Sequence, residues 1–202
     1  MKLYTNAFAP SPRRVRMFAA EKGIALTLVE LDISKGETQS PAYRQVNPTG
    51  ETPVLELDDG SRIGESLAIC RYLEALQPEP NLLGTTPLER AQIEAAALQL
   101  MFRAYVPSTH AFRHTHKFWA DKIQQVPEYG VLAREQVLAE WQRIDALLGT
   151  RAFVAGDRFT LADIVAFTTL DFGKPGGIRL QPEQANLKRW YDAIAARPSA
   201  QA

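Results

Sequence analysis

The sequence predicts two domains, a small α/β domain followed by an all-α helical domain. Three observations indicate this division. Residues 1–76 alternate between strand-like patterns, with a hydrophobic period of about two, and helix-like patterns, with a period of about 3.6. Residues 77–87 contain three prolines, a glycine and two threonines, which is typical of a linker. In residues 88–202 apolar side chains recur mainly at helical spacing.

The α/β domain is expected to contain, in order, a strand over 2–5, a helix over 11–23, a strand over 26–31, a loop or irregular helix over 34–45, a hairpin of strands over 54–57 and 61–63, and a helix over 66–76. Ser11 as N-cap and Pro12 at the first helical position predict where the first helix begins. Gly23 predicts where it ends. This is the order of a thioredoxin-like domain, and the right-handed crossover rule makes its first two strands parallel.

The helical domain is expected to contain helices over 88–105, 131–148 and 187–196, and one that begins after Thr160. Thr160 and Asp163 have the spacing of a capping box, in which each residue satisfies a backbone amide of the other. Pro107 lacks a backbone N–H, so a kink is expected there.

Composition excludes several classes of function. The hydrophobic content of 46% and charged content of 23% are those of a globular protein. The formal net charge is zero and no block of like charges occurs, which argues against non-specific nucleic-acid binding. No apolar run approaches the roughly 20 residues that span a bilayer, so no membrane association is expected.

Cys70 is the single cysteine, so the chain cannot form an internal disulfide or a Cys-x-x-Cys redox centre. A cytoplasmic location is consistent with this, and the first five residues lack the apolar core of a signal peptide. Cys70 lies inside an apolar helical pattern, which predicts a buried packing role.

Three motifs occur in a fixed order along the chain. They are Asn47-Pro48-Thr49-Gly50-Glu51-Thr52-Pro53, the pair Glu65-Ser66, and Gly156-Asp157-Arg158-Phe159-Thr160-Leu161-Ala162-Asp163. Together with the two-domain layout, they make the chain resemble the cytosolic glutathione transferases over nearly its whole length. The resemblance implies the glutathione transferase fold, glutathione as co-substrate, a homodimer, and a pocket for a small hydrophobic electrophile.

The resemblance also implies a glutathione site in the first domain. Pro53 matches the family's cis-proline, which leaves the backbone of Thr52 to pair with the cysteinyl part of glutathione. Ser66 at a helix start, with Glu65 before it, matches the pair that holds the γ-glutamyl end. Thr38 and Glu51 occupy the positions where family members often have a basic or amide residue for the glycyl carboxylate. Lys35 and Arg44 are alternatives.

The sequence offers two groups of candidates for activating the thiol. Ala9 occupies the position where many family members have a hydroxyl or thiol, and it has no donor. Ser11 is the nearest hydroxyl, and the first-turn amides and dipole of its helix also favour a thiolate. The chain resembles atypical members thought to use a water held by Ser and His, for which Ser108, His110 and His114 are candidates.

Four residues, Phe8, Tyr105, Ser108 and Arg113, are candidates for the electrophile pocket where the domains face each other. His110 and His114 have metal-ligand spacing, but no third ligand is evident and no metal is expected. A glutathione-dependent isomerase, reductive dehalogenase or disulfide reductase on the same fold is an alternative. A binding or partner-recognition protein without catalysis is another.

Overall fold

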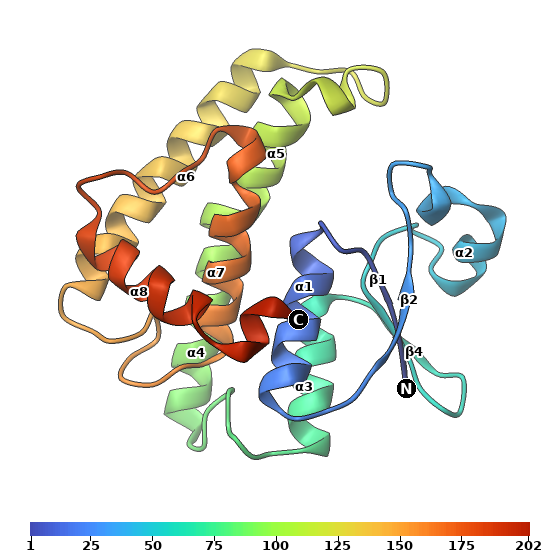
Figure 1. Ribbon diagram of the computed structural model, residues 1–202, viewed down its shortest axis with the longest axis horizontal. Coiled ribbons are helices and arrows are strands. Elements are labelled where there is room, and N and C mark those ends of the chain that lie inside the picture. The colour runs from blue at the N-terminus through green and yellow to red at the C-terminus, as the bar shows by residue number, and fades with distance from the viewer. The chain divides into compact units, whose positions relative to one another are not determined.

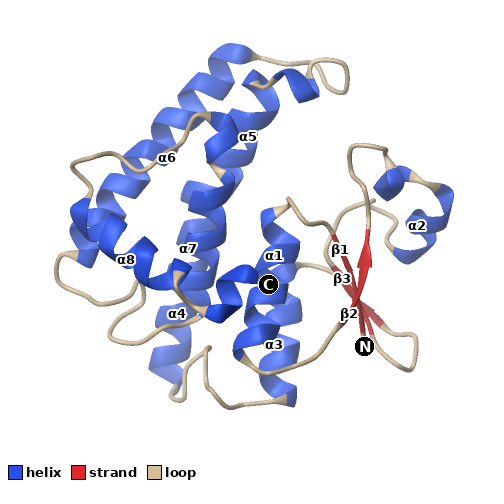
Figure 2. Cartoon of the chain, viewed as in Figure 1, coloured by secondary structure: helices blue, strands red, loops and turns tan.

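The chain divides into two compact units in the computed structural model, which describes residues 1–202. Unit 1 comprises Met1–Leu82 together with Pro198–Ala202, and unit 2 comprises Leu83–Arg197. Figure 1 follows the chain through both units, and Figure 2 shows that its strands all belong to unit 1. None of the helices combines the length and the apolar character that crossing a membrane requires.

Unit 1 is built on a mixed sheet. Its strands are β1 (Lys2–Thr5), β2 (Thr27–Glu30), β3 (Val54–Glu56) and β4 (Arg62–Ile63). They lie in the order β2-β1-β3-β4, with β1 parallel to β2 and antiparallel to β3, and β3 antiparallel to β4. Leu3 of β1 pairs with Leu55 of β3, and both side chains are fully buried. The observed order confirms the predicted thioredoxin-like domain.

Three α-helices accompany this sheet. They are α1 (Pro10–Glu21), α2 (Pro41–Val46) and α3 (Ser66–Leu76), and a short 3₁₀ turn, Glu37–Gln39, precedes α2. α1 and α3 pack against each other on one side of the sheet, with α2 on the other side (Figure 1). α1 buries Val15 and Phe18, and α3 buries Ile69, Cys70 and Leu73. These apolar positions repeat every three or four residues, as packing of one helix face requires.

The start of α1 differs from the prediction that Ser11 caps it. The helix begins at Pro10, and Ala9 is the N-cap. The carboxamide oxygen of Asn6 accepts hydrogen bonds from the backbone amides of Phe8 (3.0 Å) and Ala9 (3.1 Å). This side-chain turn directs the chain into the helix earlier, where Pro10 lacks only an amide that would have no helical partner. Ser11 is therefore inside the first turn.

The end of α1 is tied to the segment after α3 by a buried ion pair. The Lys22 ammonium is fully buried and pairs with the Glu74 carboxylate. It also donates hydrogen bonds to the carbonyls of Pro78 (3.1 Å) and Pro80 (2.6 Å). The other Glu74 oxygen accepts from the Leu82 amide at 3.0 Å. These contacts fix the last residues of unit 1 before the chain enters unit 2.

Residues 198–202 form the second part of unit 1. They include a short 3₁₀ helix, Pro198–Gln201, which packs on α1. The Ala200 carbonyl accepts a hydrogen bond from Arg13 at 3.0 Å, and the Ser199 hydroxyl donates to Glu21. The sequence carries no pattern that would predict this return of the chain to unit 1.

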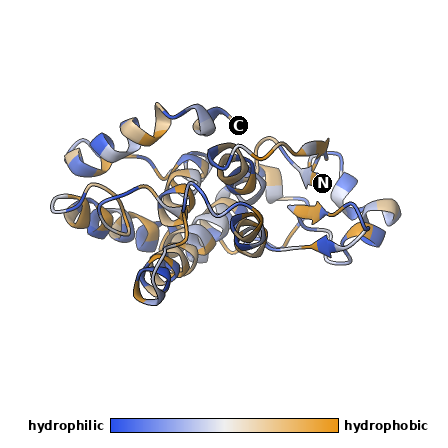
Figure 3. Cartoon of the chain, turned by 90° about the horizontal axis from the view of Figure 1, so that it is seen from below, coloured by the Kyte–Doolittle hydropathy of each residue, from blue (hydrophilic) through white to orange (hydrophobic).

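Unit 2 is helical. Its α-helices are α4 (Pro87–Leu100), α5 (Val106–Thr115), α6 (Pro127–Leu148), α7 (Leu161–Phe172) and α8 (Ala185–Ala195), with 3₁₀ turns at Lys117–Trp119 and Lys174–Gly176. Hydrophobic and hydrophilic residues alternate along the helices in Figure 3. In α7 every residue from Leu161 to Leu170 is buried. It therefore forms the centre of this unit.

The expected disruption at Pro107 takes the form of a wide helical turn. A π-helical turn, Met101–Tyr105, joins α4 to α5, and the Val106 amide donates to the Met101 carbonyl. Pro107 lies in the first turn of α5, where its missing N–H deprives the Arg103 carbonyl of its usual α-helical donor. A wider turn just before such a position redistributes the backbone hydrogen bonds.

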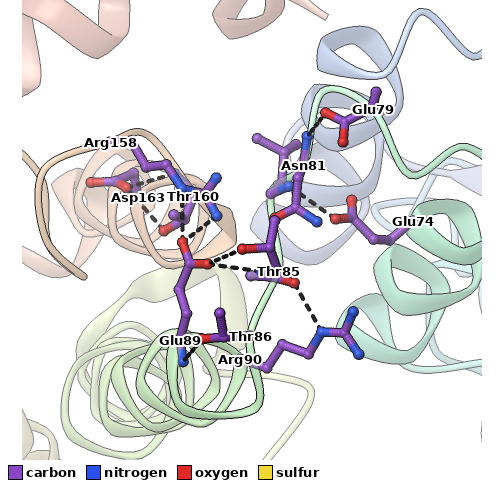
Figure 4. Close-up of polar contacts among 12 residues, drawn as sticks. Glu74, Glu79, Asn81, Thr85, Thr86, Glu89, Arg90, Arg158, Thr160 and Asp163 are labelled. Carbon is purple, nitrogen blue, oxygen red and sulfur yellow. Dashed lines mark hydrogen bonds and ion pairs between the residues drawn. The ribbon is translucent and has the colours of Figure 1, made fainter.

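Two polar clusters hold unit 2 together. The predicted capping box is present, and the Asp163 carboxylate accepts from the backbone amides of Thr160 and Val154, both at 2.9 Å. At the start of α4, Glu89 pairs with Arg158 and accepts from the Thr85 amide at 2.8 Å (Figure 4). The Thr85 bonds and the Arg158 charge lower the pKa of Glu89 to about 2.

Candidate functional site

Three segments of unit 1 meet at one edge of the sheet. Leu55 of β3 pairs with Ile63 of β4 in antiparallel register. Thr52 precedes Leu55 by three residues and Ser66 follows Ile63 by three, so both lie at the same end of this hairpin. β1 also runs antiparallel to β3, so the loop between β1 and α1 leaves the sheet at that end. The predicted glutathione residues Thr52, Pro53, Glu65 and Ser66 are thus brought together.

The N-terminus of α3 offers backbone donors at this edge. Ser66 is the first helical residue, and the preceding Glu65 provides no side-chain cap. The amides of Ser66, Leu67 and Ala68 form no hydrogen bond within the chain. Unpaired first-turn amides and the positive end of the helix dipole both favour a bound anion. This geometry suits a carboxylate.

Ser66 lies over a buried arginine. The residue is only 4% exposed, and its hydroxyl oxygen accepts a hydrogen bond from Arg14 of α1 at 2.7 Å. Arg14 itself is fully buried. The sequence placed Arg14 among three arginines at the start of this helix without distinguishing which of them faces inward, so its contact with Ser66 was missed.

Glu65 has an unusual backbone conformation. It is the one residue other than glycine with a positive φ, at 61°, and its ψ is 115°. Such conformations cost on the order of 1–3 kcal/mol and are concentrated at ligand sites. The Glu65 side chain is exposed at the edge where Ser66 begins its helix. A carboxylate here favours a ligand with a positive group beside its negative one.

The backbone of Thr52 is available for an extended ligand. The Thr52–Pro53 peptide bond is cis, as predicted. The amide and carbonyl of Thr52 form no hydrogen bond within the chain. The neighbouring Glu51 carbonyl, by contrast, accepts from the Tyr43 hydroxyl (2.7 Å) and the Asn47 carboxamide (2.8 Å). The backbone is therefore held firmly next to a free donor and acceptor, the arrangement that binds a peptide as an added strand.

The residues predicted for the glycyl carboxylate are placed less favourably. Thr38 is only 5% exposed, so its side chain packs inside unit 1, whereas the neighbouring Gln39 is exposed. Glu51 is exposed and carries a negative charge. Arg44 already donates to the Pro48 carbonyl at 2.6 Å and to the Gln39 side chain at 2.5 Å.

The start of α1 provides one polar candidate for a thiol. Ser11 is half-buried at the second helical position. Pro10 and Pro12, on either side of it, have no backbone N–H, so Ser11 supplies the only amide among the first three helical residues. Fewer amides therefore face this position than the sequence predicts. Phe8, the pocket candidate in this unit, is 90% exposed.

The histidines of unit 2 form a cluster with Tyr129. Nδ1 of His110 lies 2.8 Å from the Tyr129 hydroxyl, and Nδ1 of His114 accepts from the Val126 amide at 3.1 Å. The His110 and His114 rings are 6.3 Å apart. Partial burial, followed by the charges of His114 and Arg113, lowers the pKa of His110.

The remaining unit 2 candidates differ in accessibility. Ser108 is 1% exposed and its hydroxyl has no hydrogen-bond partner within the chain. Tyr105 is half-buried. Arg113 is exposed and lies 5.3 Å from the ring centre of Trp119. Their shared pocket with Phe8 stays a prediction.

No group of three or more His, Cys, Asp or Glu side chains is arranged to hold a metal ion. A groove of about 510 Å³ lies on unit 2 between α4 and the end of α6, with Gln92, Gln99, Arg143 and Arg151 among its lining residues. None of the site residues predicted from the sequence lines this groove.

Cys70 is expected to react with a chromogenic disulfide reagent at least about 100-fold more slowly than a free cysteine at about pH 8. Its thiol is fully buried in α3, as predicted, and burial raises its pKa to about 12 although the Arg14 charge lowers it. As the pH rises through the ordinary thiol range, the unfolded chain should ionise and the native thiol should not. Rapid labelling of the native protein would contradict this.

Comparison with known proteins gives matches along the whole chain. Residues 8–76 match the glutathione S-transferase N-terminal domain, and residues 93–198 match the glutathione S-transferase C-terminal domain. Glutathione S-transferase 2 of Saccharomyces cerevisiae is 34% identical over 203 residues, which cover 98% of this chain and 87% of the yeast protein. Maleylacetoacetate isomerase of Pseudomonas aeruginosa is 30% identical, with coverage of 98% and 93%. The crystal structure of Gtt2 from Saccharomyces cerevisiae has a TM-score of 0.94 at 33% identity, with coverage of 100% and 99%.

Proposed function

Because the chain belongs to the glutathione S-transferase family, we propose that it binds glutathione in unit 1 and transfers the glutathione thiolate to an electrophilic carbon. The observation that carries this proposal is the set of free donors at one sheet edge, namely the first-turn amides of α3 beside Ser66 and the backbone of Thr52. A γ-glutamyl peptide thiol presents groups that complement both.

Each part of glutathione has a place in this proposal. The γ-glutamyl carboxylate binds the amides and hydroxyl at Ser66, and its ammonium lies near Glu65. The cysteinyl backbone pairs with Thr52. The glycyl carboxylate meets Gln39 or Lys35, whose side chains are exposed and carry N–H donors. The negative charge of Glu51 near this end should limit affinity.

The sulfur is then held near the start of α1. The thiol loses its proton, the thiolate forms a carbon–sulfur bond, and the electrophile releases its leaving group or takes up a proton. Ser11, through its amide or hydroxyl, is the proposed partner of the thiolate, since Ala9 has no donor. A water held by Ser108, His110 or His114 is the proposed alternative proton acceptor, as expected for an atypical member of the family.

A glutathione titration across pH, followed by thiolate absorbance at about 240 nm, tests the proposal. We expect the bound thiol to titrate well below free glutathione, because positioned donors favour its anion. Replacing Ser11 by Ala should raise the pKa of the bound thiol if its hydroxyl is the donor. An unchanged pKa of the bound thiol, with glutathione binding intact, would favour the water held by Ser108, His110 or His114. No binding of glutathione by the wild-type protein would contradict the proposal.

A glutathione-dependent isomerase is the second candidate. The 30% identity to the Pseudomonas aeruginosa maleylacetoacetate isomerase over nearly the full length favours it specifically. An isomerase regenerates free glutathione after each turnover, whereas a transferase consumes it in stoichiometric amounts. Measuring free thiol during turnover of each substrate class separates the two. Binding without a lowered thiol pKa would favour a non-catalytic binding protein.

A further inference from the structure

Arg14 is a fully buried arginine in the first half of α1. Arginine is rarely buried completely, because removing a guanidinium from water carries a large desolvation cost. The side chain lies where α1 packs on α3, and its charge also acts on Cys70, one helical turn after Ser66. The permanent positive charge is therefore located at the N-terminal end of α3.

The contact between Arg14 and Ser66 has a defined polarity. A guanidinium has only donors, so the Ser66 oxygen must be the acceptor in their 2.7 Å hydrogen bond. The hydroxyl proton of Ser66 is then left to donate to another group. Hydrogen bonds in such a chain polarise one another, so the charge on Arg14 strengthens the hydroxyl as a donor.

We propose that Arg14 is a positioning residue that makes the site selective for thiols bearing a free γ-glutamyl carboxylate, by acting through the hydroxyl of Ser66. The inference rests on the proposed glutathione site. The carboxylate meets the α3 amides and the Ser66 hydroxyl on one side, and the Arg14 charge lies directly behind that hydroxyl. Ligands without the carboxylate gain nothing from this arrangement.

A purely structural arginine would stabilise the packing of α1 on α3 and would affect all ligands of unit 1 alike. The ratio of two affinities distinguishes the roles. Glutathione is compared with 4-aminobutyryl-cysteinylglycine, which has the same backbone but lacks the γ-glutamyl carboxylate. Binding of both compounds is measured by calorimetry for the wild-type protein, Arg14→Met, Arg14→Lys, Ser66→Ala and the Arg14→Met/Ser66→Ala double variant. Arg71→Met, on the exposed side of α3, is the matched control.

The wild-type protein should prefer glutathione over the analogue by about 100-fold, as expected for a charge-assisted hydrogen bond to a buried group. Arg14→Met and Ser66→Ala should each lower glutathione affinity by about 30-fold while changing analogue affinity by less than about 3-fold. The double variant should be within about 3-fold of the weaker single variant, because both residues act in one chain. Arg14→Lys retains the charge and should lower the ratio by about 5-fold; it also provides a milder variant should Arg14→Met fold poorly.

Equal weakening of both ligands in Arg14→Met would overturn the inference and leave a packing role. An unchanged ratio in both Arg14 variants would also overturn it, while leaving the proposed function standing if the wild-type protein binds glutathione. A wild-type protein that binds neither compound would overturn the proposed function and this inference together.

Discussion

Replacing Asp163 by Ala is expected to lower the free energy of unfolding of unit 2 by about 3–5 kcal/mol. The Asp163 side chain is fully buried and accepts hydrogen bonds from the amides of Thr160 and Val154 and from the Trp190 indole, each at 2.9 Å. Alanine would leave these donors without a partner inside the protein. Each unsatisfied buried donor costs about 1–3 kcal/mol.

Urea denaturation followed by tryptophan fluorescence measures this effect, since all three tryptophans lie in unit 2 and Trp190 contacts Asp163. Asp163→Asn should be intermediate, because its carboxamide retains one acceptor oxygen. Asp121→Ala is the control: that side chain is 81% exposed, and its removal should cost less than about 0.5 kcal/mol. A loss below about 1 kcal/mol for Asp163→Ala would contradict the role assigned to this carboxylate.

Replacing Lys22 by Met is expected to destabilise unit 1 by about 3–5 kcal/mol, the usual cost of removing one partner from a buried ion pair. Glu74 would be left buried without the ammonium, and the carbonyls of Pro78 and Pro80 would lose their shared donor. The double variant Lys22→Met/Glu74→Gln should recover part of the loss, because it removes the stranded charge but keeps an acceptor for the Leu82 amide.

The readout for Lys22→Met must come from unit 1, which contains no tryptophan. The stability of unit 1 is measured by labelling Cys70 in increasing urea. This thiol is buried in the core of unit 1 and becomes reactive when that core opens. Lys35→Met is the control. Lys35 is 74% exposed in its pair with Asp32, and exposed pairs contribute about 1 kcal/mol or less. Equal labelling midpoints for the two variants would rule out the proposed role of the buried pair.

The sequence was most informative where the signal was local. Strand β1, helix α3 and the capping box at Thr160 lie where predicted, because alternation, helical spacing and cap residues act over a few positions. The edge that gathers Thr52 and Ser66 could also be anticipated from their spacing around the predicted hairpin. The prediction that glutathione binds at this edge required the resemblance of the motifs to those of the glutathione transferases.

Features that depend on tertiary packing could not be predicted from local sequence patterns. Asn6, which moves the start of α1 from the predicted Pro12 to Pro10, is fixed in place by its 2.7 Å bond to the Leu31 carbonyl of a distant segment. The burial of Arg14 depends on which side of α1 meets α3, and three arginines within four residues cover most sides of a helix. Likewise, the burial of Thr38 depends on the packing of its loop against the segment at Gly50. The two segments are so close that a Cβ added to Gly50 would lie only 2.8 Å from the Thr38 carbonyl oxygen.

The return of Pro198–Ala202 to α1 makes unit 1 discontinuous, with the whole of unit 2 inserted between its parts. During synthesis on the ribosome the first 82 residues emerge long before the five that complete their packing. Domains generally fold as they emerge, so unit 2 can assemble while unit 1 still lacks its C-terminal piece. Emergence of Pro198–Ala202, which lets the Ala200 carbonyl accept from Arg13, is thus the event that closes unit 1.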